Sequence, residues 1–369
     1  MTMVFHPHGW IRNDQMVELI DYAVAKHGKK VKFLTFKESL ERLNTNLLDG
    51  HSVRHPDNAG DHGVRIFDLN NDGYMDRIIH NTPVRGKSKS KGNGTRVWDM
   101  RRKTWSVADS IDFITATVSA EFQTDAGVRF AIVRQQPRAF VRFTAHAFGP
   151  IDQGWTFNGR YWSRDTASNG LPLVDHPFAS APYLEIPVLT GWKNFDPAFR
   201  LLDLDADGNC EAILGYLNQR AVFMWSKKGL WARAPFDLPQ SACFVDARGN
   251  STGVRFVDLN GDGKLDIIFS NEKEYGIYLF TDMEKGWSKK ILHGKRGESE
   301  PRALASGSGA AAAAALAARD ELPMISRQGQ NNGFWVHSGY LWWSNEDTVL
   351  LKDHVDRRKI AELLRAAEK

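Results

Sequence analysis

Short apolar runs alternate with polar turns along most of the chain. In residues 253–272, a mainly apolar run leads into an acidic turn, and a second apolar run, Leu265–Phe269, follows it. Apolar runs of this length, bounded by Gly, Asn and Asp, predict β-strands joined by tight loops. In this part of the chain we expect strands at 253–258, 265–270, 276–280 and 287–292.

The same order of strands and turns recurs. Four copies end at a tryptophan, and they begin at Gly63, Gly127, Ala198 and Gly253. A shorter fifth copy begins at Gly333, and the loop between its first two strands is reduced. Short strands in sets of four, repeated about every 55 to 80 residues, are typical of a β-propeller in which each repeat is one blade. The sequence therefore predicts a mainly β fold with five recognisable blades in residues 50–352.

Three segments interrupt this pattern. The spacers 163–195 and 289–331 are long enough to hold further blades, so the blade number stays open. Residues 303–319 are rich in Ala after a Ser-Gly run, which is typical of a low-complexity insertion. The last segment, 353–369, predicts an amphipathic helix that begins near residue 356 and has its apolar residues at Ile360, Leu363 and Leu364.

Residues 1–49 follow a different order. We expect a strand at 4–6, a helix capped by Asn13 and Asp14 and ended by Gly28, a strand at 31–34 and a second helix after the capping box that starts at Thr35. The inward faces of these helices would consist of Met16, Leu19, Ile20, Ala23 and Val24 in the first and Leu40, Leu43 and Leu47 in the second. This order belongs to a parallel α/β fold, which needs more strands than the segment has. We expect the end of a larger α/β domain.

The acidic turn of the fourth copy carries oxygen donors at its first, third, fifth and ninth positions. These donors are Asp258, Asn260, Asp262 and Asp266. Gly263, at the sixth position, permits the left-handed backbone that wraps such a loop around an ion, and Lys264, at the seventh, would offer its carbonyl oxygen. Ca²⁺ takes about six to eight oxygen ligands, so the spacing predicts a calcium loop. An EF-hand would instead place its last acid at about position twelve and continue into a helix.

Two further copies repeat this spacing. The first-copy loop has Asp68, Asn70, Asp72, Tyr74 and Asp76, and the third-copy loop has Asp203, Asp205, Asp207, Asn209 and Glu211. The acids give the three loops formal charges of −3, −4 and −3 in chain order, so a cation would relieve repulsion within each loop. We expect about three calcium ions. The alternative is a set of solvated acidic turns, and it fits the third-copy loop best because Glu replaces Asp there. The second copy has lost these acids, and we expect no metal in it.

Composition and charge narrow the function classes. The chain is 42% hydrophobic and 25% charged, which is typical of a globular protein. Its net charge of +4 is small and its basic residues are dispersed, which gives no support to nucleic-acid binding. We expect no membrane span, because no run of about 18 apolar residues is present. Cys210 and Cys243 are too few for a disulfide framework and lack the spacing of metal ligands.

Two groups of residues are candidates for ligand binding. An arginine occupies the same position in four copies, at Arg65, Arg129, Arg200 and Arg255. If the first strands lie innermost, these side chains would face a central channel and attract an acidic glycan; alternatively, each pairs with the acidic loop of its own blade. We expect packing roles for the tryptophans that end the copies, which are Trp105, Trp162, Trp231 and Trp287. The candidates for stacking on sugars are Trp335, Trp342 and Trp343.

The acidic loop between two strands, seen at Asp258–Asp266 and in two other copies, resembles the loop of FG-GAP/VCBS repeats. The resemblance covers about residues 50–350. It implies a calcium-stabilised β-propeller in which the loop carboxylates bind metal and are therefore not free for acid–base chemistry.

A second resemblance concerns the first 49 residues. The segments Phe5–Ile11 and Gly28–Phe36 resemble the C-terminal end of polysaccharide deacetylases of the carbohydrate-esterase type. This resemblance implies a distorted (β/α) barrel, a divalent metal held by an Asp and two His of earlier segments, and a late apolar-x-His motif that supplies a catalytic acid. His6 fits that motif best and His8 is second. The base and metal motifs would precede Met1, so we expect this chain alone not to be catalytic.

These observations favour a non-catalytic, calcium-binding β-propeller that binds carbohydrate or protein in a polysaccharide-processing system. Residues 1–49 would be available to a protein partner. We expect an extracytoplasmic location, where calcium is abundant, although the Met1 end lacks the layout of a signal peptide. The alternatives are an enzyme, as part of a deacetylase completed by another chain or as a hydrolase or lyase on the propeller, and a purely structural protein–protein platform. We find no phosphate-binding loop and no recognisable Ser/His/Asp arrangement.

Overall fold

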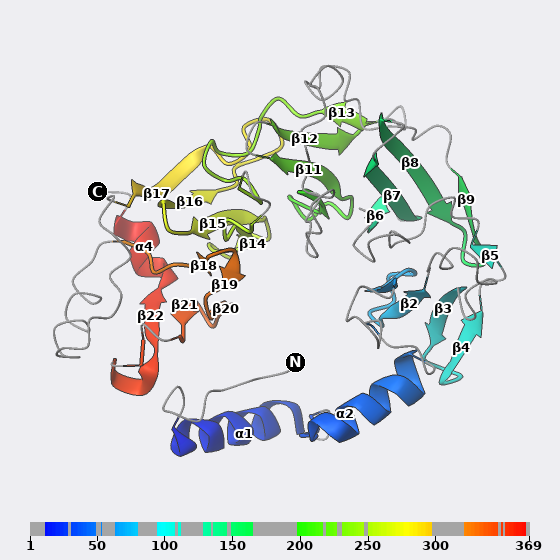
Figure 1. Ribbon diagram of the computed structural model, residues 1–369, viewed down its shortest axis with the longest axis horizontal. Coiled ribbons are helices and arrows are strands. Elements are labelled where there is room, and N and C mark those ends of the chain that lie inside the picture. The colour runs from blue at the N-terminus through cyan, green and yellow to red at the C-terminus, as the bar shows by residue number, and fades with distance from the viewer. Residues whose placement is uncertain are drawn as a thin grey trace. The chain divides into compact units, whose positions relative to one another are not determined.

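The structure, a computed structural model, is mainly β with small N-terminal helices (Figure 1). It describes residues 12–28, 31–48, 53, 63–79, 94–107, 110–111, 128–133, 136–145, 149–164, 198–216, 219–226, 231–246, 250–296, 321–345, 348–349 and 351–366. The chain divides into two compact units. The first unit comprises Met1–Leu34, Pro239–Asp246 and Asn250–Lys369, and the second unit comprises Thr35–Leu238 and Ala247–Gly249.

The second unit contains three sheets with the strand order of propeller blades. The first sheet has the order β1-β2-β3-β4, with β1 (Val64–Phe67), β2 (Asp76–Ile79), β3 (Gly94–Asp99) and β4 (Thr104–Val107). The next has the order β5-β9-β8-β7-β6, with β5 (Ser110–Ile111), β6 (Val128–Val133), β7 (Gln136–Ala145), β8 (Gly149–Phe157) and β9 (Tyr161–Arg164). The third has the order β10-β11-β12-β13, with β10 (Phe199–Leu202), β11 (Glu211–Tyr216), β12 (Gln219–Trp225) and β13 (Trp231–Arg233). Each is antiparallel except where β5 joins β9 in parallel.

The first unit contains the remaining sheets. Its four-stranded blade has the order β14-β15-β16-β17, with β14 (Arg255–Val257), β15 (Asp266–Ser270), β16 (Glu274–Leu279) and β17 (Lys289–Lys295). Its three-stranded sheet has the order β20-β21-β22, with β20 (Phe334–His337), β21 (Tyr340–Trp343) and β22 (Asp356–Lys359). A two-stranded ribbon consists of β18 (Ser326–Arg327) and β19 (Gln330–Asn331). Among these strands β17 lies at a sheet edge, and its Lys289, Lys290 and Lys295 are exposed. The fold is thus that of β-propeller blades, and each of the five sequence copies forms its own sheet.

The closing tryptophans pack as the repeat predicts. In four copies the tryptophan lies against an aromatic ring at the end of the preceding strand or just after it, with ring centroids 5.0 to 5.3 Å apart in the pairs Trp98–Trp105, Phe157–Trp162, Trp225–Trp231 and Phe280–Trp287. Such contacts bury large apolar rings at favourable angles. Their recurrence confirms the expected packing role of these residues.

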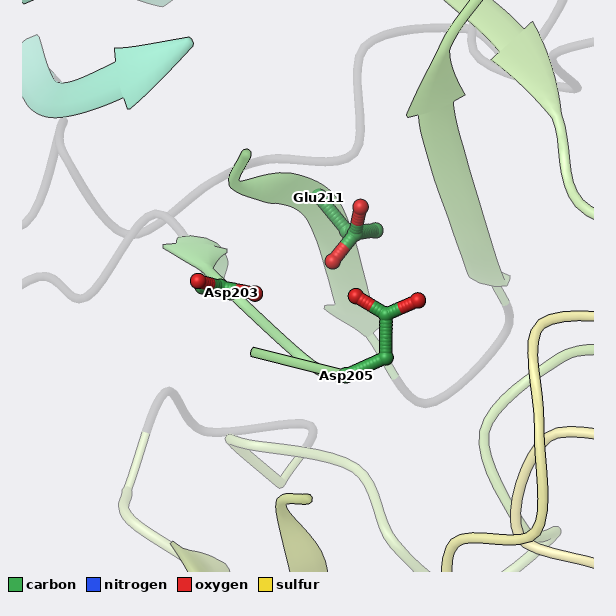
Figure 2. A group of neighbouring side chains, drawn as sticks. All are labelled: Asp203, Asp205 and Glu211. Carbon is green, nitrogen blue, oxygen red and sulfur yellow. The ribbon is translucent and has the colours of Figure 1, made fainter. Parts of the chain in front are cut away.

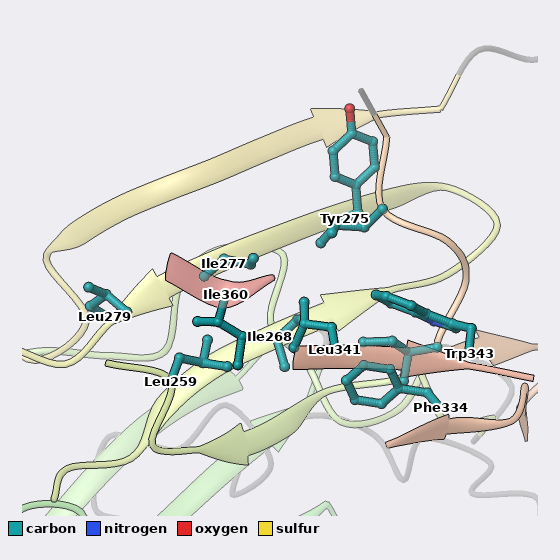
Figure 3. Packing of buried hydrophobic residues seen from close by; sticks show 11 residues of the cluster. Leu259, Ile268, Tyr275, Ile277, Leu279, Phe334, Leu341, Trp343 and Ile360 are labelled. Atoms are coloured by element: carbon teal, nitrogen blue, oxygen red, sulfur yellow. The ribbon is translucent and has the colours of Figure 1, made fainter. Parts of the chain in front are cut away.

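Neighbouring blades share their cores. In the second unit, Leu69 and Ile78 of the first sheet pack with Trp155 and Trp162 of the next. In the first unit, Ile268 and Ile277 of the four-stranded blade pack with Leu341 and Trp343 of the last sheet and with Ile360 of helix α4 (Ile360–Ala366) (Figure 3). Each sheet therefore depends on its neighbour for burial, as in other repeat architectures.

The N-terminal segment differs from the sequence prediction in part. Helix α1 (Asn13–His27) ends before Gly28 as expected, but its N-cap is Arg12, and the expected caps Asn13 and Asp14 lie inside the helix. Helix α2 (Phe36–Arg42) has the Thr35–Glu38 capping box before it continues as the π-helix η2 (Leu43–Leu48). The expected strand at 31–34 is wrong: no described strand pairs with it, and Val31 N donates to Gly28 O at 3.2 Å in a turn. A strand without a neighbour leaves its backbone groups unpaired within the sheet.

The expected inward faces of these helices are also wrong in part. Ile20 and Val24 of α1 are exposed, as are Leu40 and Leu43 at the second helix, whereas Leu48 is buried. Helix α1 is held at its start by polar contacts within the first unit: Arg12 Nη1 lies 2.8 Å from Asp353 Oδ1, and Gln15 Nε2 donates to Asp353 O at 2.7 Å. Because these polar contacts hold α1 at one end, the helix does not need to bury an apolar face.

The C-terminal segment also differs from its prediction. Residues 356–359 form β22 instead of helix, because their backbone pairs in register with β21, and the helix starts only at Ile360. The expected strand at 4–6, the residues His6 and His8, and the Ala-rich segment 303–319 lie outside the described residues.

Candidate functional site

Three acidic loops share one backbone geometry. In each, the carboxylate at the first position accepts the backbone N–H groups of the fifth and sixth positions. The distances are 3.1 and 2.8 Å for Asp68, 3.1 and 2.9 Å for Asp203, and 3.1 and 2.9 Å for Asp258. The sixth-position glycines Gly73, Gly208 and Gly263 have φ of 85°, 86° and 84°, a region that favours glycine. The spacing seen in the sequence therefore produces the same tight turn three times.

The fifth-position carboxylates cap the same turn. Asp72 accepts from Tyr74 N at 2.9 Å, Asp207 accepts from Asn209 N at 2.7 Å, and Asp262 accepts from Lys264 N at 2.9 Å. The Lys264 side chain turns to another partner, since its Nζ donates to Thr281 O at 2.6 Å. The third-position amides Asn70 and Asn260 accept from the N–H groups of Asp72 and Asp262 at 3.2 and 3.0 Å. Ligation through the carbonyls of the seventh residues stays a prediction.

The ninth-position acids lie inside the protein. Asp76, Glu211 and Asp266 are 0%, 4% and 0% exposed. Each accepts a hydrogen bond from the N–H of the buried leucine at the second position, with distances of 2.8, 2.9 and 2.9 Å from Leu69, Leu204 and Leu259. Asp76 and Asp266 also accept from the third strand, from Trp98 N and Phe280 N, each at 2.8 Å. These two carboxylates therefore hold the loop to the blade with both oxygens.

Burial disfavours the ionised form of several loop acids. Loss of hydration raises the pKa of Asp76 and Asp205, raises the pKa of Asp266 to about 6, and raises that of Glu211 to about 8. Backbone N–H groups that donate to the buried acids act in the opposite direction, and the other acids of each loop raise the pKa further. A cation beside them would favour the ionised forms.

The third-copy loop gathers its acids most closely. One oxygen each of Asp203, Asp205 and Glu211 lies within 4.8 Å of the others, and Figure 2 shows the three side chains converging from the loop and the start of β11. Asp207 stays outside this group and accepts two hydrogen bonds from Asn209, at 2.7 and 3.1 Å. Carboxylate and carbonyl oxygens are the ligands of a hard cation such as Ca²⁺, so the donor set of the loops fits that ion.

The repeated arginines have the same place in their blades. Arg65, Arg200 and Arg255 each lie opposite an isoleucine of the second strand and each donate from Nη1 to the carbonyl of the preceding residue, at 3.0, 3.0 and 2.9 Å. Arg129 lies opposite Phe140. All four are partly buried. Whether they bind a ligand stays a prediction.

The three candidate tryptophans of the last sheet separate into two environments. Trp343 is 0% exposed and belongs to the core, so its expected role in stacking on sugars is wrong. Adjacent positions of a strand point to opposite faces, so Trp342 and its cross-strand neighbour Trp335 lie on the other face. Trp335 is 42% exposed. These two remain candidates.

A polar group that the sequence did not indicate joins Ser241, which precedes the four-stranded blade, to Glu274 of β16 and His293 of β17. Ser241 Oγ donates to Glu274 Oε2 at 2.7 Å, and His293 Nε2 lies 3.4 Å from Ser241 Oγ and 3.8 Å from Glu274 Oε2. In a catalytic triad the acid contacts the ring nitrogen that faces away from the serine. Here Nε2 is near both partners, so the geometry is not that of a triad. No local motif could have found this group, because its members are far apart in the sequence.

The cysteine within the third-copy loop has a raised pKa. Burial, with the nearby acids, raises the pKa of the Cys210 thiol to about 12, so it stays protonated. The reactive form of cysteine is the thiolate.

Comparison with known proteins supports the repeat assignment. The FG-GAP-like repeat family matches residues 203–269, which include the third-copy and fourth-copy loops. A search of curated proteins finds no match to the sequence. No helix in the described part of the chain has the length and apolar character needed to cross a membrane.

Proposed function

We propose that this protein is a calcium-binding β-propeller that serves as a non-catalytic binding module. The observation that carries the proposal is the threefold recurrence of one loop geometry, with three to four acids in each loop and the ninth acid buried. Acidic groups that are held together by a fixed backbone repel each other. A divalent cation bound between them attracts each carboxylate and so offsets this repulsion. The match of two of the loops to the FG-GAP-like repeat supports the same conclusion.

Calcium would act here as a structural ion. Each loop joins the first two strands of a blade, so an ion bound in the loop fixes the angle between those strands. An ion that binds only the folded protein stabilises it by mass action. With a Kd of about 10⁻⁴–10⁻³ M, as in extracellular calcium modules, about 10 mM calcium would add roughly 1.4–2.7 kcal/mol per loop. A Kd in this range is that of extracellular calcium modules, which supports an extracytoplasmic location.

The ligand of the module, in this proposal, is a carbohydrate or a protein of a polysaccharide-processing system. Exposed aromatic rings and dispersed arginines support a saccharide ligand, and the exposed apolar side chains Val17, Phe36 and Leu40 support a protein partner for the N-terminal helices. The deacetylase interpretation of residues 1–49 stays a prediction, because the residues that carry its motif lie outside the described ranges.

The experiment that tests this proposal measures bound metal and stability together. We expect about three calcium ions per chain by elemental analysis, and a clear fall in Tm when a chelator is added. Asp262→Ala should lower the calcium content by about one ion. As a matched control, Asp282→Ala removes an aspartate that caps a turn through Glu284 N and Lys285 N outside the repeat loops, and the calcium content should not change. A wild-type protein with no bound calcium and no response to chelator would refute the proposal.

A further inference from the structure

One face of the last sheet combines aromatic rings with cations. In β20-β21-β22, Phe334, Leu341 and Trp343 point into the core. The residues between them occupy the opposite face, here called the aromatic face: Trp335, His337, Tyr340, Trp342, Arg357 and Lys359. No member of the aromatic face is acidic. The aromatic face therefore carries only aromatic and basic side chains at these six positions, whereas the acidic Asp356 lies on the core-facing side with Arg358.

Trp335, Trp342 and Arg357 lie side by side across the three strands and form the first row of the aromatic face. The strand register places Trp335 opposite Trp342 and Trp342 opposite Arg357. The two indole rings are nearly parallel, at 6°, with centroids 6.1 Å apart. The Arg357 guanidinium carbon lies 5.9 Å from the centroid of the Trp342 ring. A cation near an aromatic ring is attracted by the negative face of the ring, so Arg357 stabilises the stack.

Further contacts fix the position of this stack. Trp342 Nε1 donates to His337 O at 3.1 Å, and the Tyr340 ring centroid lies 5.9 Å from that of Trp342. Trp335 stands on β20, at the edge of the sheet, and keeps 42% of its surface exposed. A ring that is held from one side and exposed on the other loses little side-chain entropy when a ligand packs on it.

The second row places another cation beside this platform. The register puts His337 opposite Tyr340 and Tyr340 opposite Lys359. Arg357 and Lys359 are exposed, and both lie on β22, two residues apart on the same face. Arginine offers a planar set of N–H donors that fits a carboxylate or a sulfate, and lysine offers a point charge.

We propose that the aromatic face binds an acidic polysaccharide, with one sugar ring packed on Trp335 and the acidic groups of the chain directed to Arg357 and Lys359. The proposal rests on the carbohydrate-binding function proposed above and adds the ligand class and the place of binding. A pyranose ring presents an apolar C–H face that an exposed indole can cover, and two nearby cations without a neighbouring acid on the face favour a negatively charged chain.

The same features favour a saccharide over single-stranded nucleic acid. Proteins that bind single strands use a basic groove along the backbone, with several rings on which successive bases stack. Here one ring is exposed at the edge and the face has two permanent cations. A single platform with few charges fits one sugar unit and its acidic neighbours.

The test is calorimetric titration of the calcium-loaded full chain with oligogalacturonate too short to gel, and with its neutral methyl ester. We expect the wild type to bind the acid at least about tenfold more tightly than the ester. Trp335→Ala should weaken binding of the acid roughly 30-fold, the size typical of a central aromatic contact. Trp335→Tyr should restore most of it, and Arg357→Gln should weaken binding of the acid but not of the ester.

Two controls separate binding from folding. Tyr161→Ala removes an aromatic side chain of similar exposure, 45%, from a sheet of the second unit, and Lys290→Gln removes an exposed cation from β17; neither should change the affinity. The Trp335→Ala variant should keep the calcium content of the wild type, which would show that its fold is intact.

The outcomes distinguish this inference from the proposed function. If the wild type binds the saccharide and Trp335→Ala binds it with unchanged affinity, the aromatic face is not the binding site, but the proposal of carbohydrate binding stands. Preference for the methyl ester, or tighter binding of a single-stranded oligonucleotide, would overturn the ligand class. Failure of the wild type to bind either saccharide would overturn the inference, whereas the calcium content and the response of Tm to chelator would still decide the proposed function separately.

Discussion

The third-copy loop (residues 203–211) and the fourth-copy loop (residues 258–266) have the same backbone but different ninth residues. Asp266 accepts from Leu259 N at 2.9 Å and from Phe280 N at 2.8 Å, so its two oxygens connect the loop to the third strand. Glu211 accepts from Leu204 N at 2.9 Å, and one of its oxygens lies within 4.8 Å of Asp203 and Asp205. One extra methylene group therefore directs a buried carboxylate toward other acids instead of toward the third strand.

This difference has an electrostatic consequence. The pKa of Asp266 is raised to about 6, whereas that of Glu211 is raised to about 8, mainly because both are buried. The added N–H donor lowers the pKa of Asp266, while the acids near Glu211 raise its pKa further. The fourth-copy loop is therefore stabilised more by its own hydrogen bonds, whereas the third-copy loop would gain more stability from a cation.

The largest expected effect is a pH dependence in the presence of chelator. The folded pKa of Glu211, about 8, is above its unfolded value of 4.5, so the folded state retains a proton that the unfolded chain releases. The free energy of unfolding should therefore be highest below about pH 4.5 for this group and fall, by a few kcal/mol at most, as pH rises to about 8. Urea unfolding at several pH values measures this.

A variant locates this effect. Because the pKa of Asp266 reaches only about 6, a loss between about pH 6 and 8 is expected from Glu211 and not from Asp266. Glu211→Gln should abolish that part and reduce the fall below pH 6 to the share of the other buried acids, such as Asp266. Saturating calcium should flatten the curve of the wild type. A curve between pH 6 and 8 that is the same in Glu211→Gln and wild type would contradict the assignment.

Removal of the Asp266 carboxylate should lower the free energy of unfolding by nearly as much. Asp266→Ala leaves the buried N–H groups of Leu259 and Phe280 without their acceptor, and we expect a loss of about 3 kcal/mol in the free energy of unfolding even with chelator present. Glu211→Ala removes one such acceptor and a group that is costly to ionise, so its loss with chelator should be about 1 kcal/mol. Equal losses in both variants would remove the distinction between the two loops.

A conversion of one loop into the other should have a smaller effect. Glu211 lies opposite Met224 by extension of the β11–β12 register, so the third-strand N–H that corresponds to that of Phe280 belongs to Trp225. In the Glu211→Asp variant, the shorter carboxylate should accept a hydrogen bond from this N–H group. The free energy of unfolding should then rise by about 1 kcal/mol at pH 8 with chelator. Its pH dependence between pH 6 and 8 should weaken. Lower stability at pH 8 would show that the shorter side chain does not reach Trp225.

The smallest expected effect concerns the turn glycine. Gly263 has φ of +84° and an added Cβ would meet no atom within 4 Å, so Gly263→Ala should cost only backbone strain, about 1 kcal/mol. It should also weaken calcium binding, because the loop backbone shifts. Gly159→Ala is the matched control: its φ is +91° with equally open space, and it lies in a turn without the acidic loop. That variant should lose similar stability with unchanged calcium content.

The blade repeat and the acidic loops could be predicted from the sequence because both are local. The strands of the fourth copy were expected at 265–270 and 276–280 and are observed at Asp266–Ser270 and Glu274–Leu279. The role of Asp266 as a link to the third strand could not be predicted, because Phe280 is 14 positions away and only the sheet register brings its N–H to the carboxylate.

The errors have the same cause. Trp342 and Trp343 are neighbours in the sequence and equally apolar, so only the orientation of the strand decides which is buried. The apolar residues at 31–34 are typical of a strand, but no described strand lies beside them. Residues 356–359 form a strand because β21 offers a partner, although the residues that follow have helical spacing. Each outcome depends on a neighbour distant in sequence.

The exposed lysines of β17 bear on how copies of the protein behave next to each other. An edge strand presents unpaired backbone groups that another chain can use to extend the sheet. Lys289, Lys290 and Lys295 lie along this edge, so a second strand that paired there would bring like charges together and remove several ammonium groups from water. The basic edge therefore opposes edge-to-edge pairing of two copies of the protein through this sheet.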